Sequence, residues 1–574
     1  MLKENYKDLA KKAQKIYQDS LSETLKIVKF DEELTKKYES LPSAIGKTTE
    51  EFGNPTKFPF ELYLKTVPSS VLAITEKDPI ELLKDLKTRK ITCVEVLKAY
   101  FTAAIIASKL VNCIVEFLPK EALEFAENLD KQYDSKKDLP MYGLPFSIKE
   151  MIPFKNRAVT HGSLCYLDRI VDYNADIINI LMNQGGAYPF VRTTNPQSLM
   201  MLECVSLQHG RTVNPFNSEL TSGGSSGGEG ALNGLYASTF GLGSDIGGSI
   251  RTPAGFNGIY GLRTTLGRIP TADYFSCNLG STTILSVTGP ISRSLGMVDL
   301  VMKTIIDSKP ELIDPSLTSI PWKESEQNQK KYRIGILKSD GIVNPSPPVL
   351  RALDIIENKL KKLPNVEVVE YHPFKQEKVM EILSKIYFED GAKDFHSTVK
   401  DTGEPILEQT KWAIEGATEL SMHDQWYWNL EKEKFRKEYL KHWISYKDSS
   451  NHILDAVIAP IYPNVAPKHG QGQYWNYTCT YNLLDYPVLV VPITIVDQNL
   501  DLPKKNYKPL NEMDEFHFKC YDSPKSFEKA PVNLSVIGLR NTDEKLIEIG
   551  KIIQNEIGDI FNPNGEKDNC PIKE

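Results

Sequence analysis

The chain has 574 residues, of which 41% are hydrophobic and 25% are charged, and its formal net charge is −7. This composition is typical of a globular protein with room for a large core. The negative charge disfavours a protein that binds nucleic acid through a basic surface, so we expect no nucleic-acid partner.

The cysteines give no sign of a metal centre or a disulfide framework. None of the eight forms a CxxC pair, and no HExxH spacing occurs, so we expect reduced thiols, no metal and no cofactor. The first 19 residues are charged throughout, and no run reaches the roughly 18 apolar residues of a membrane span. We therefore predict a cytoplasmic protein without a membrane span. Peripheral membrane contact and a homodimer stay open.

The N-terminal part of the chain predicts helices. Residues 1–76 read as a helical extension that ends in a proline-punctuated loop. A helix is predicted at 92–110, because Thr92 and Glu95 form a capping box and apolar residues follow at helical spacing. A second helix is expected at 120–134. The stretch "MYGLPFSIKEMI" (141–152) then predicts a turn that enters a short buried strand.

The remainder of the chain predicts an α/β fold. Between 178 and 262, short apolar runs alternate with helical patterns and glycine turns, which favours an α/β sheet. Residues 332–372 predict strand, helix and strand again. Residues 375–450 are rich in helix formers, and strands return at 456–463 and 486–495. Because no repeat is found, we expect one catalytic domain at 77–574 with a helical insert at about 375–450.

The segment from Gly223 to Gly261 contains 13 glycines in 39 residues. A flexible linker is disfavoured, because apolar sequence lies on both sides. A phosphate-binding loop is disfavoured too, because GxxxxGK[ST] is absent and Ile246 stands where a dinucleotide fingerprint needs its third glycine. An oxyanion site remains: Gly247 and Gly248 let successive amides face one point, and Ser249 lies there as a nucleophile.

Two motifs in this segment carry a resemblance to a known family. "GGSSGGEGAL" (223–232) and "GLGSDIGGSIRTPAGFNGIYGL" (241–262) strongly resemble the amidase signature family, which hydrolyses amides with a Ser–cis-Ser–Lys triad. "YGLPFSIKE" (142–150) and "PFVRTTNPQSL" (189–199) extend the likeness, which covers roughly 78–555. Among the branches, the chain is most similar to fungal acetamidase-type amidases, with likeness to fatty acid amide hydrolase.

The resemblance implies a fold and a set of roles. It implies a mixed twisted sheet with helices on both faces. It also implies that Lys149 is the base, Ser225 the bridging cis-serine and Ser249 the nucleophile. The implied oxyanion hole and supports follow the same motifs: backbone amides of Ile246, Gly247, Gly248 and Ser249, substrate contact at Leu199, and supporting side chains of Ser226, Asp245 and Arg251.

The chemistry of the implied base sets a requirement on the fold. A lysine side chain titrates near 10.4, so Lys149 accepts a proton near neutral pH only if burial lowers its pKa. The apolar neighbours in "PFSIKEMIPF" favour that burial. We therefore expect an amidohydrolase that acts on a small-molecule amide through an acyl-enzyme. The alternatives are a subunit of the glutamyl-tRNA amidotransferase type and a non-catalytic binding protein on the same fold.

Overall fold

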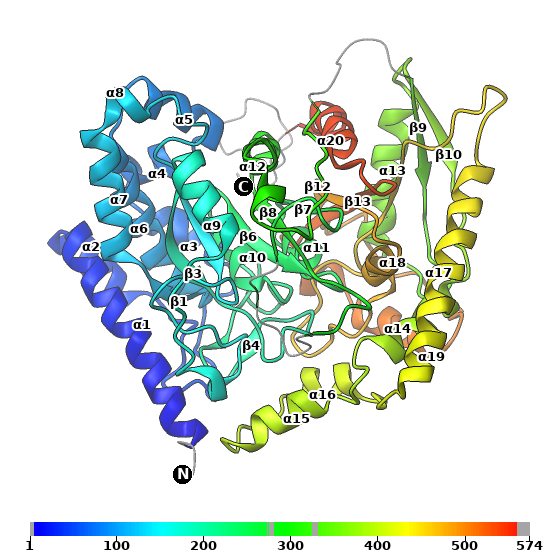
Figure 1. Ribbon diagram of the computed structural model, residues 1–574, viewed down its shortest axis with the longest axis horizontal. Helices are drawn as coiled ribbons and strands as arrows, with labels where there is room; N and C mark the ends of the chain where they lie inside the picture. Colours follow the sequence, from blue (N-terminus) through cyan, green and yellow to red (C-terminus); the bar gives the residue numbers. More distant parts are fainter. Residues whose placement is uncertain (1–4, 272–273, 275–279, 324–330, 559–574) are drawn as a thin grey trace.

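The computed structural model describes residues 5–271, 274, 280–323 and 331–558 (Figure 1). Its centre is an 11-stranded sheet with the strand order β1-β3-β2-β6-β8-β7-β12-β13-β11-β9-β10, and β4 and β5 form a separate pair. The strands are β1 Ile114–Phe117, β2 Pro145–Lys149, β3 Tyr188–Thr193, β4 Val205–Ser206, β5 Gly210–Arg211, β6 Gly241–Asp245, β7 Tyr260–Arg263, β8 Val287–Ser292, β9 Tyr332–Ile336, β10 Val366–Glu370, β11 Ala456–Pro460, β12 Val488–Ile495 and β13 Pro531–Ile537.

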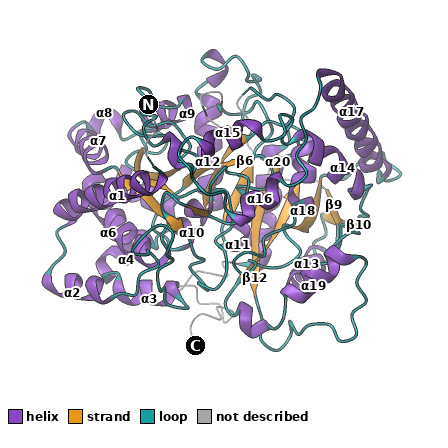
Figure 2. Ribbon diagram, turned by 90° about the horizontal axis from the view of Figure 1, so that it is seen from below, coloured by secondary structure: helices purple, strands orange, loops and turns teal. Residues whose placement is uncertain are grey.

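Helices lie on both sides of this sheet (Figure 2), as the resemblance implied. They are α1 Tyr6–Val28, α2 Glu32–Ser40, α3 Pro59–Thr66, α4 Ser69–Thr75, α5 Pro79–Lys87, α6 Cys93–Val111, α7 Pro119–Lys131, α8 Tyr133–Lys136, α9 Asp176–Ile180, α10 Gly227–Gly234, α11 Arg251–Phe256, α12 Leu295–Asp307, α13 Pro347–Leu360, α14 Gln376–Ile386, α15 Lys393–Lys400, α16 Glu408–Ile414, α17 Met422–Ser445, α18 Asn476–Leu484, α19 Glu512–Cys520 and α20 Asp543–Ile557. Shorter helical turns occupy Leu164–Tyr166, Leu181–Gly185, Pro310–Leu312 and Pro524–Phe527.

The predicted elements are largely present. Helix α6 begins after Thr92, whose side chain and that of Glu95 form the capping box. The strand expected in "MYGLPFSIKEMI" is β2, and the helix-rich range 375–450 holds α14 to α17. The six cysteines among the described residues form no disulfide bonds with one another, whereas Cys277 and Cys570 lie outside the described residues.

The N-terminal helices share the core of the sheet. Tyr17 of α1 is buried in the main hydrophobic cluster, and its hydroxyl lies 2.9 Å from the hydroxyl of Ser108 in α6. Ser20 of α1 accepts a hydrogen bond from the backbone N–H of Phe117 in β1. The first helix therefore packs against the edge of the sheet, where β1 is the last strand.

The direction of the strands places the functional residues together. β2 is parallel to both of its neighbours, β3 and β6. The carboxyl ends of parallel strands meet at one edge of a sheet, which is where α/β proteins bind their ligands. Lys149, Thr193 and Asp245 are the last residues of these three strands, so the sheet directs the predicted base and the glycine-serine segment to the same edge.

Candidate active site

Lys149 is buried completely at the end of β2. Its Nζ atom lies 2.6 Å from Oγ of Ser225 and 2.8 Å from Oγ of Ser244. Burial lowers the pKa of Lys149 to about 7, against the opposing pull of Asp245, Glu229 and Glu150. Because desolvation disfavours the ammonium form, this lysine is available as a base near neutral pH.

The two predicted serines come from neighbouring turns. Ser225 follows a cis peptide bond after Gly224 and lies just before α10, and Ser249 lies just before α11. The backbone N–H of Ser226 donates to the carbonyl oxygen of Ser249 at 3.1 Å. The hydroxyl of Ser226 accepts from the backbone N–H of Ser244 at 3.3 Å. Ser226 thus ties both turns to the end of β6.

A buried ion pair fixes the loop between β6 and Ser249. Asp245 accepts two hydrogen bonds from Arg251, from Nε at 3.0 Å and from an Nη atom at 2.8 Å. It also accepts from the amides of Gly248 at 2.9 Å and Ile250 at 3.0 Å. Burial alone would raise the pKa of Asp245, but the charge of Arg251 and the hydrogen bonds from Arg251 and Asn482 together outweigh burial and hold this pKa well below its usual range. The charged pair therefore defines the course of the loop.

The carbonyl groups of the same loop are held by distant segments. The hydroxyl of Tyr387, which follows α14, donates to the carbonyl oxygen of Ile246 at 3.0 Å. The hydroxyl of Thr478 in α18 donates to the carbonyl oxygen of Gly247 at 2.6 Å. A side chain at Gly248, where φ is +136°, would place Cβ 2.7 Å from the hydroxyl of Thr478. Only glycine fits this position, because the backbone approaches α18 too closely.

The backbone amide of Gly248 is already engaged within the protein. Its N–H is bonded to Asp245. Among the residues that the structure describes, the amides of Ile246, Gly247 and Ser249 have no hydrogen-bond partner. The loop therefore offers three of the four predicted amides to a ligand.

The described residues enclose a pocket of about 90 Å³ at this edge of the sheet. Four predicted site residues line it: Leu199, Ser225, Ile246 and Ser249. Gly247, Gly248, Ser226, Asp245 and Arg251 lie behind this lining and shape the loop. Leu199 reaches the pocket from the loop after β3 with φ of +63°. Ser225 and Ser249 therefore border the same small space.

Several lining residues were not identified from the sequence. They are Met151, Ser198, Met200, Ser244, Ser281, Ile284, Leu285 and Ser286. The sequence held a signal for one of them, because Ser244 stands directly before Asp245 in "GLGSDIGGS". It held none for Tyr387 and Thr478, which reach the loop from far along the chain.

Among the residues that the structure describes, neither a histidine nor a metal-binding group is part of this site. The described lining contains no histidine, and burial lowers the pKa of His209 to about 4 and that of His161 to about 3. Among the described residues, no three His, Cys, Asp or Glu side chains are placed to hold a metal ion. No helix in the described part is long and apolar enough to cross a bilayer.

A comparison with protein families decides what this arrangement represents. The model of the family "Amidase" matches residues 95–547. The chain belongs to the amidase family. It is an enzyme that hydrolyses amide C–N bonds, as the paired glycine-serine motifs predicted.

Individual members of the amidase family resemble the chain over most of its length. It is 40% identical to a putative amidase of Schizosaccharomyces pombe, over 86% of this chain and 92% of that protein. It is 35% identical to an acetamidase of Emericella nidulans, over 86% of this chain and 91% of that protein. Among solved structures, a fatty acid amide hydrolase superposes with a TM-score of 0.82 at 30% identity, over 93% of this amidase and 96% of that chain.

Proposed function

We propose that this amidase cleaves small carboxylic amides through an acyl-enzyme formed on Ser249. The observation that carries the proposal is the buried Lys149, whose Nζ lies 2.6 Å from the hydroxyl of Ser225 in the wall of a pocket that Ser249 also lines. A lysine with a pKa of about 7 supplies the base that a serine nucleophile needs when no histidine is near.

The proton path follows from this arrangement. Neutral Lys149 takes the proton of Ser225, and Ser225 takes the proton of Ser249 as its oxygen attacks the amide carbonyl carbon. The same groups return a proton to the leaving nitrogen when the C–N bond breaks. This return is essential because an amide anion is a poor leaving group. Water then attacks the acyl-enzyme, releases the carboxylic acid and restores Ser249.

The loop after β6 supplies the stabilisation of the tetrahedral intermediate. The amides of Ile246, Gly247 and Ser249 are the donors that we assign to the oxyanion. Donors held rigidly at the developing charge lower the barrier most, because they need no reorganisation during the reaction. The Asp245–Arg251 ion pair and the hydrogen bonds from Tyr387 and Thr478 provide that rigidity.

The size of the pocket supports a short acyl group. A cavity of about 150 Å³ holds benzene. The pocket of about 90 Å³ is smaller than that cavity, which favours a short acyl chain over a long or aromatic one. The names of the acetamidase relatives point in the same direction, so we propose primary amides of about two to four carbons as substrates.

Labelling and a substrate series test the proposal. A fluorophosphonate should modify Ser249, and Ser249→Ala should abolish labelling and lower amide hydrolysis by at least about 10⁴-fold, because the acyl-enzyme cannot form. The matched control is Ser286→Ala, which removes a hydroxyl from the same pocket. With the wild-type enzyme, kcat/KM should fall along the series from propionamide to octanamide. Labelling of another residue would refute the nucleophile, and a rate that rises with chain length would refute the short acyl group.

A further inference from the structure

Three consecutive residues of the catalytic pocket belong to the loop that follows β3. Ser198, Leu199 and Met200 line the pocket, and we call residues 198–202 the pocket loop. The φ angle is +65° at Ser198 and +63° at Leu199. Residues other than glycine rarely adopt this left-handed conformation, and they keep it only where surrounding contacts impose it. The contacts at the two ends of the pocket loop therefore determine where it presents these side chains.

Gln197 stands directly before the pocket loop and is completely buried. Its Nε2 atom donates to Oε1 of Glu404 at 2.9 Å and to the carbonyl oxygen of Pro405 at 3.0 Å. Its Oε1 atom accepts from the backbone N–H of Leu407 at 3.0 Å. All three partners lie in the segment 404–407, between α15 and α16. One amide side chain therefore joins the pocket loop to the helical insert.

The carboxyl group of Glu404 is fixed on its other side as well. Glu404 is only 4% exposed, and its Oε2 atom accepts from the backbone N–H of Leu164 at 2.9 Å. Burial raises the pKa of Glu404 to about 7. Each of its two oxygens has a donor, and Gln197 is one of them. Loss of the Gln197 amide would leave a buried acceptor unpaired, which costs more than an ordinary hydrogen bond contributes.

The far end of the pocket loop is bound to the same part of the insert. Glu203 is only 1% exposed, and its carboxylate accepts from Nε2 of Gln409 in α16 at 3.1 Å. It also accepts from the backbone N–H of Gly470 at 2.8 Å and lies 2.8 Å from Nδ1 of His469. The pocket loop is therefore held at both ends, and residues of the insert contribute at each end.

The hydrogen bonds of the Gln197 side chain do not involve the groups that we assign to the chemistry. Lys149 is bonded to Ser225 and Ser244. A separate buried ion pair fixes the loop that leads to Ser249. A change at Gln197 should therefore displace the pocket loop and leave the base and the nucleophile in place.

We propose that Gln197 is a positioning residue for the substrate: it fixes the pocket loop against the helical insert, so that Leu199 and its neighbours hold the amide in one orientation. This inference rests on the proposed function of the pocket around Ser249. The pocket loop carries neither the base, the nucleophile nor the oxyanion donors. Its displacement therefore weakens substrate binding more than the chemical step, and the loss falls on KM rather than on kcat.

Removing the amide tests whether Gln197 acts through its hydrogen bonds. Gln197→Met keeps the length of the side chain but has no strong donor or acceptor. The assay uses the best substrate of the amide series at pH 8, above the pKa of about 7 of Lys149 and Glu404. KM should rise about tenfold and kcat should stay within about twofold. Gln132→Met, at an exposed glutamine outside the pocket, is the matched control.

Exchanging the two partners tests the contact directly. Glu404→Gln puts an amide N–H₂ against a second donor, so KM should rise about threefold to tenfold. Adding Gln197→Glu should return KM to within about twofold of the wild type. In this double variant the new carboxylate accepts from the new amide and from the N–H of Leu407, and the new amide oxygen accepts from the N–H of Leu164. Glu408→Gln, the same change at an exposed position of α16, should have no effect.

A fluorophosphonate separates this inference from the proposed function. It should label Ser249 in the wild type and in every variant, and circular dichroism verifies that each variant folds. Absence of labelling in the wild type would refute the proposed function. With labelling intact, a folded Gln197→Met protein that has the wild-type KM, or that loses only kcat, would refute the positioning role alone. So would a double variant whose KM is no lower than that of Glu404→Gln, and this comparison decides if Gln197→Met does not fold.

Discussion

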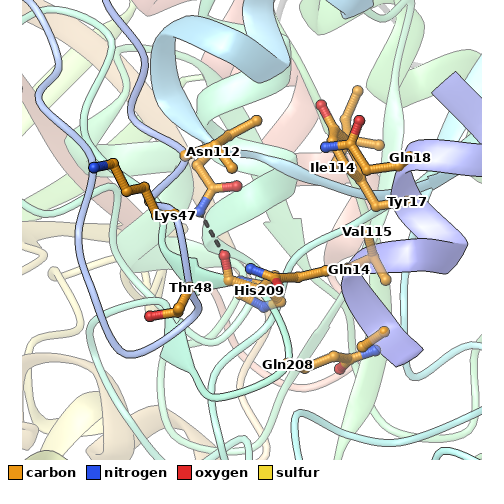
Figure 3. Close-up of a pocket in the computed structure, with 13 residues that line it drawn as sticks. Gln14, Tyr17, Gln18, Lys47, Thr48, Asn112, Ile114, Val115, Gln208 and His209 are labelled. Atoms are coloured by element: carbon orange, nitrogen blue, oxygen red, sulfur yellow. Dashed lines mark hydrogen bonds between the residues drawn. The ribbon is translucent and has the colours of Figure 1, made fainter. Parts of the chain in front are cut away.

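The catalytic pocket differs from a second pocket (Figure 3), which Gln14 of α1, Asn112 and Gln208 line and which we call the polar pocket, in how its polar groups are paired. In the catalytic pocket, Lys149 is bonded to two serines, and Asp245 is bonded to Arg251 and to two amides of its own loop. In the polar pocket, Gln208 and Asn112 each leave one group without a partner in the described protein. Internal pairing fixes the geometry before the substrate arrives, whereas the groups left unpaired in the polar pocket meet solvent.

The comparison also separates two uses of burial. Around Lys149, burial acts on a titratable group and changes its proton affinity, which is a chemical function. Gln208 and Asn112 are neutral amides. Burial therefore changes only the free-energy cost of leaving them without a hydrogen-bond partner. The first pocket should therefore respond to pH and to loss of a charge. The second should respond to shape and hydrogen bonding.

The largest effect should come from removing the base. Lys149→Ala should lower kcat/KM for an amide by about 10³-fold. The variant has no acceptor for the serine proton during attack and no donor for the leaving nitrogen afterwards. Hydrolysis of the matching ester should fall less, since an alcohol leaves more easily than an amine. Lys155→Ala removes an exposed lysine nearby and should retain the wild-type rate. Parallel steady-state assays on amide and ester measure the difference, and equal losses on both substrates would contradict a returned proton.

A smaller effect should appear in the pH profile of the unmodified enzyme. Only neutral Lys149 acts as a base, so kcat/KM should rise about tenfold per pH unit below a pKa of about 7 and level off above it. His209 and His161 titrate well below this range, so they do not produce the rise. Initial rates from pH 5 to 9 provide the measurement. A profile that is flat between pH 5 and 8 would exclude Lys149 as the titrating group.

The smallest effect concerns substrate length. Ile284 is buried in the wall of the catalytic pocket, and Ile284→Ala should enlarge the space for the acyl chain. The ratio of kcat/KM for hexanamide to that for acetamide should rise about tenfold, the lower range for a change of one methylene in an apolar pocket. Ile313→Ala, at an exposed isoleucine outside the pocket, should leave the ratio unchanged. An unchanged ratio in Ile284→Ala would mean that this wall does not limit the chain.

Local patterns in the sequence were sufficient for most of the elements and for naming the residues that we propose to react. The capping box of α6, the apolar run of β2 and the glycines around Ser249 each depend on neighbours a few residues apart. Each pattern meets a local physical requirement: a cap for the helix, a pleated face for the strand and a close backbone approach at the glycines. Lys149, Ser225 and Ser249 were identified in this way together with the family motifs. These residues lie together at one edge of the sheet because β2 is parallel to β3 and β6.

Only the tertiary structure decided how the loop is held and what the pockets admit. Thr478 reaches Gly247 across 231 residues and Tyr387 reaches Ile246 across 141, and neither contact leaves a pattern in the intervening sequence. The same holds for Gln208 and Asn112, which meet α1 only after the chain has folded around β1. Volume, burial and the proton affinity of Lys149 depend on atoms from many segments at once. The sequence therefore indicated which groups we propose to react. The packing decided which of these groups are charged, which are paired and how much space lies between them, because each of these properties depends on atoms from distant segments.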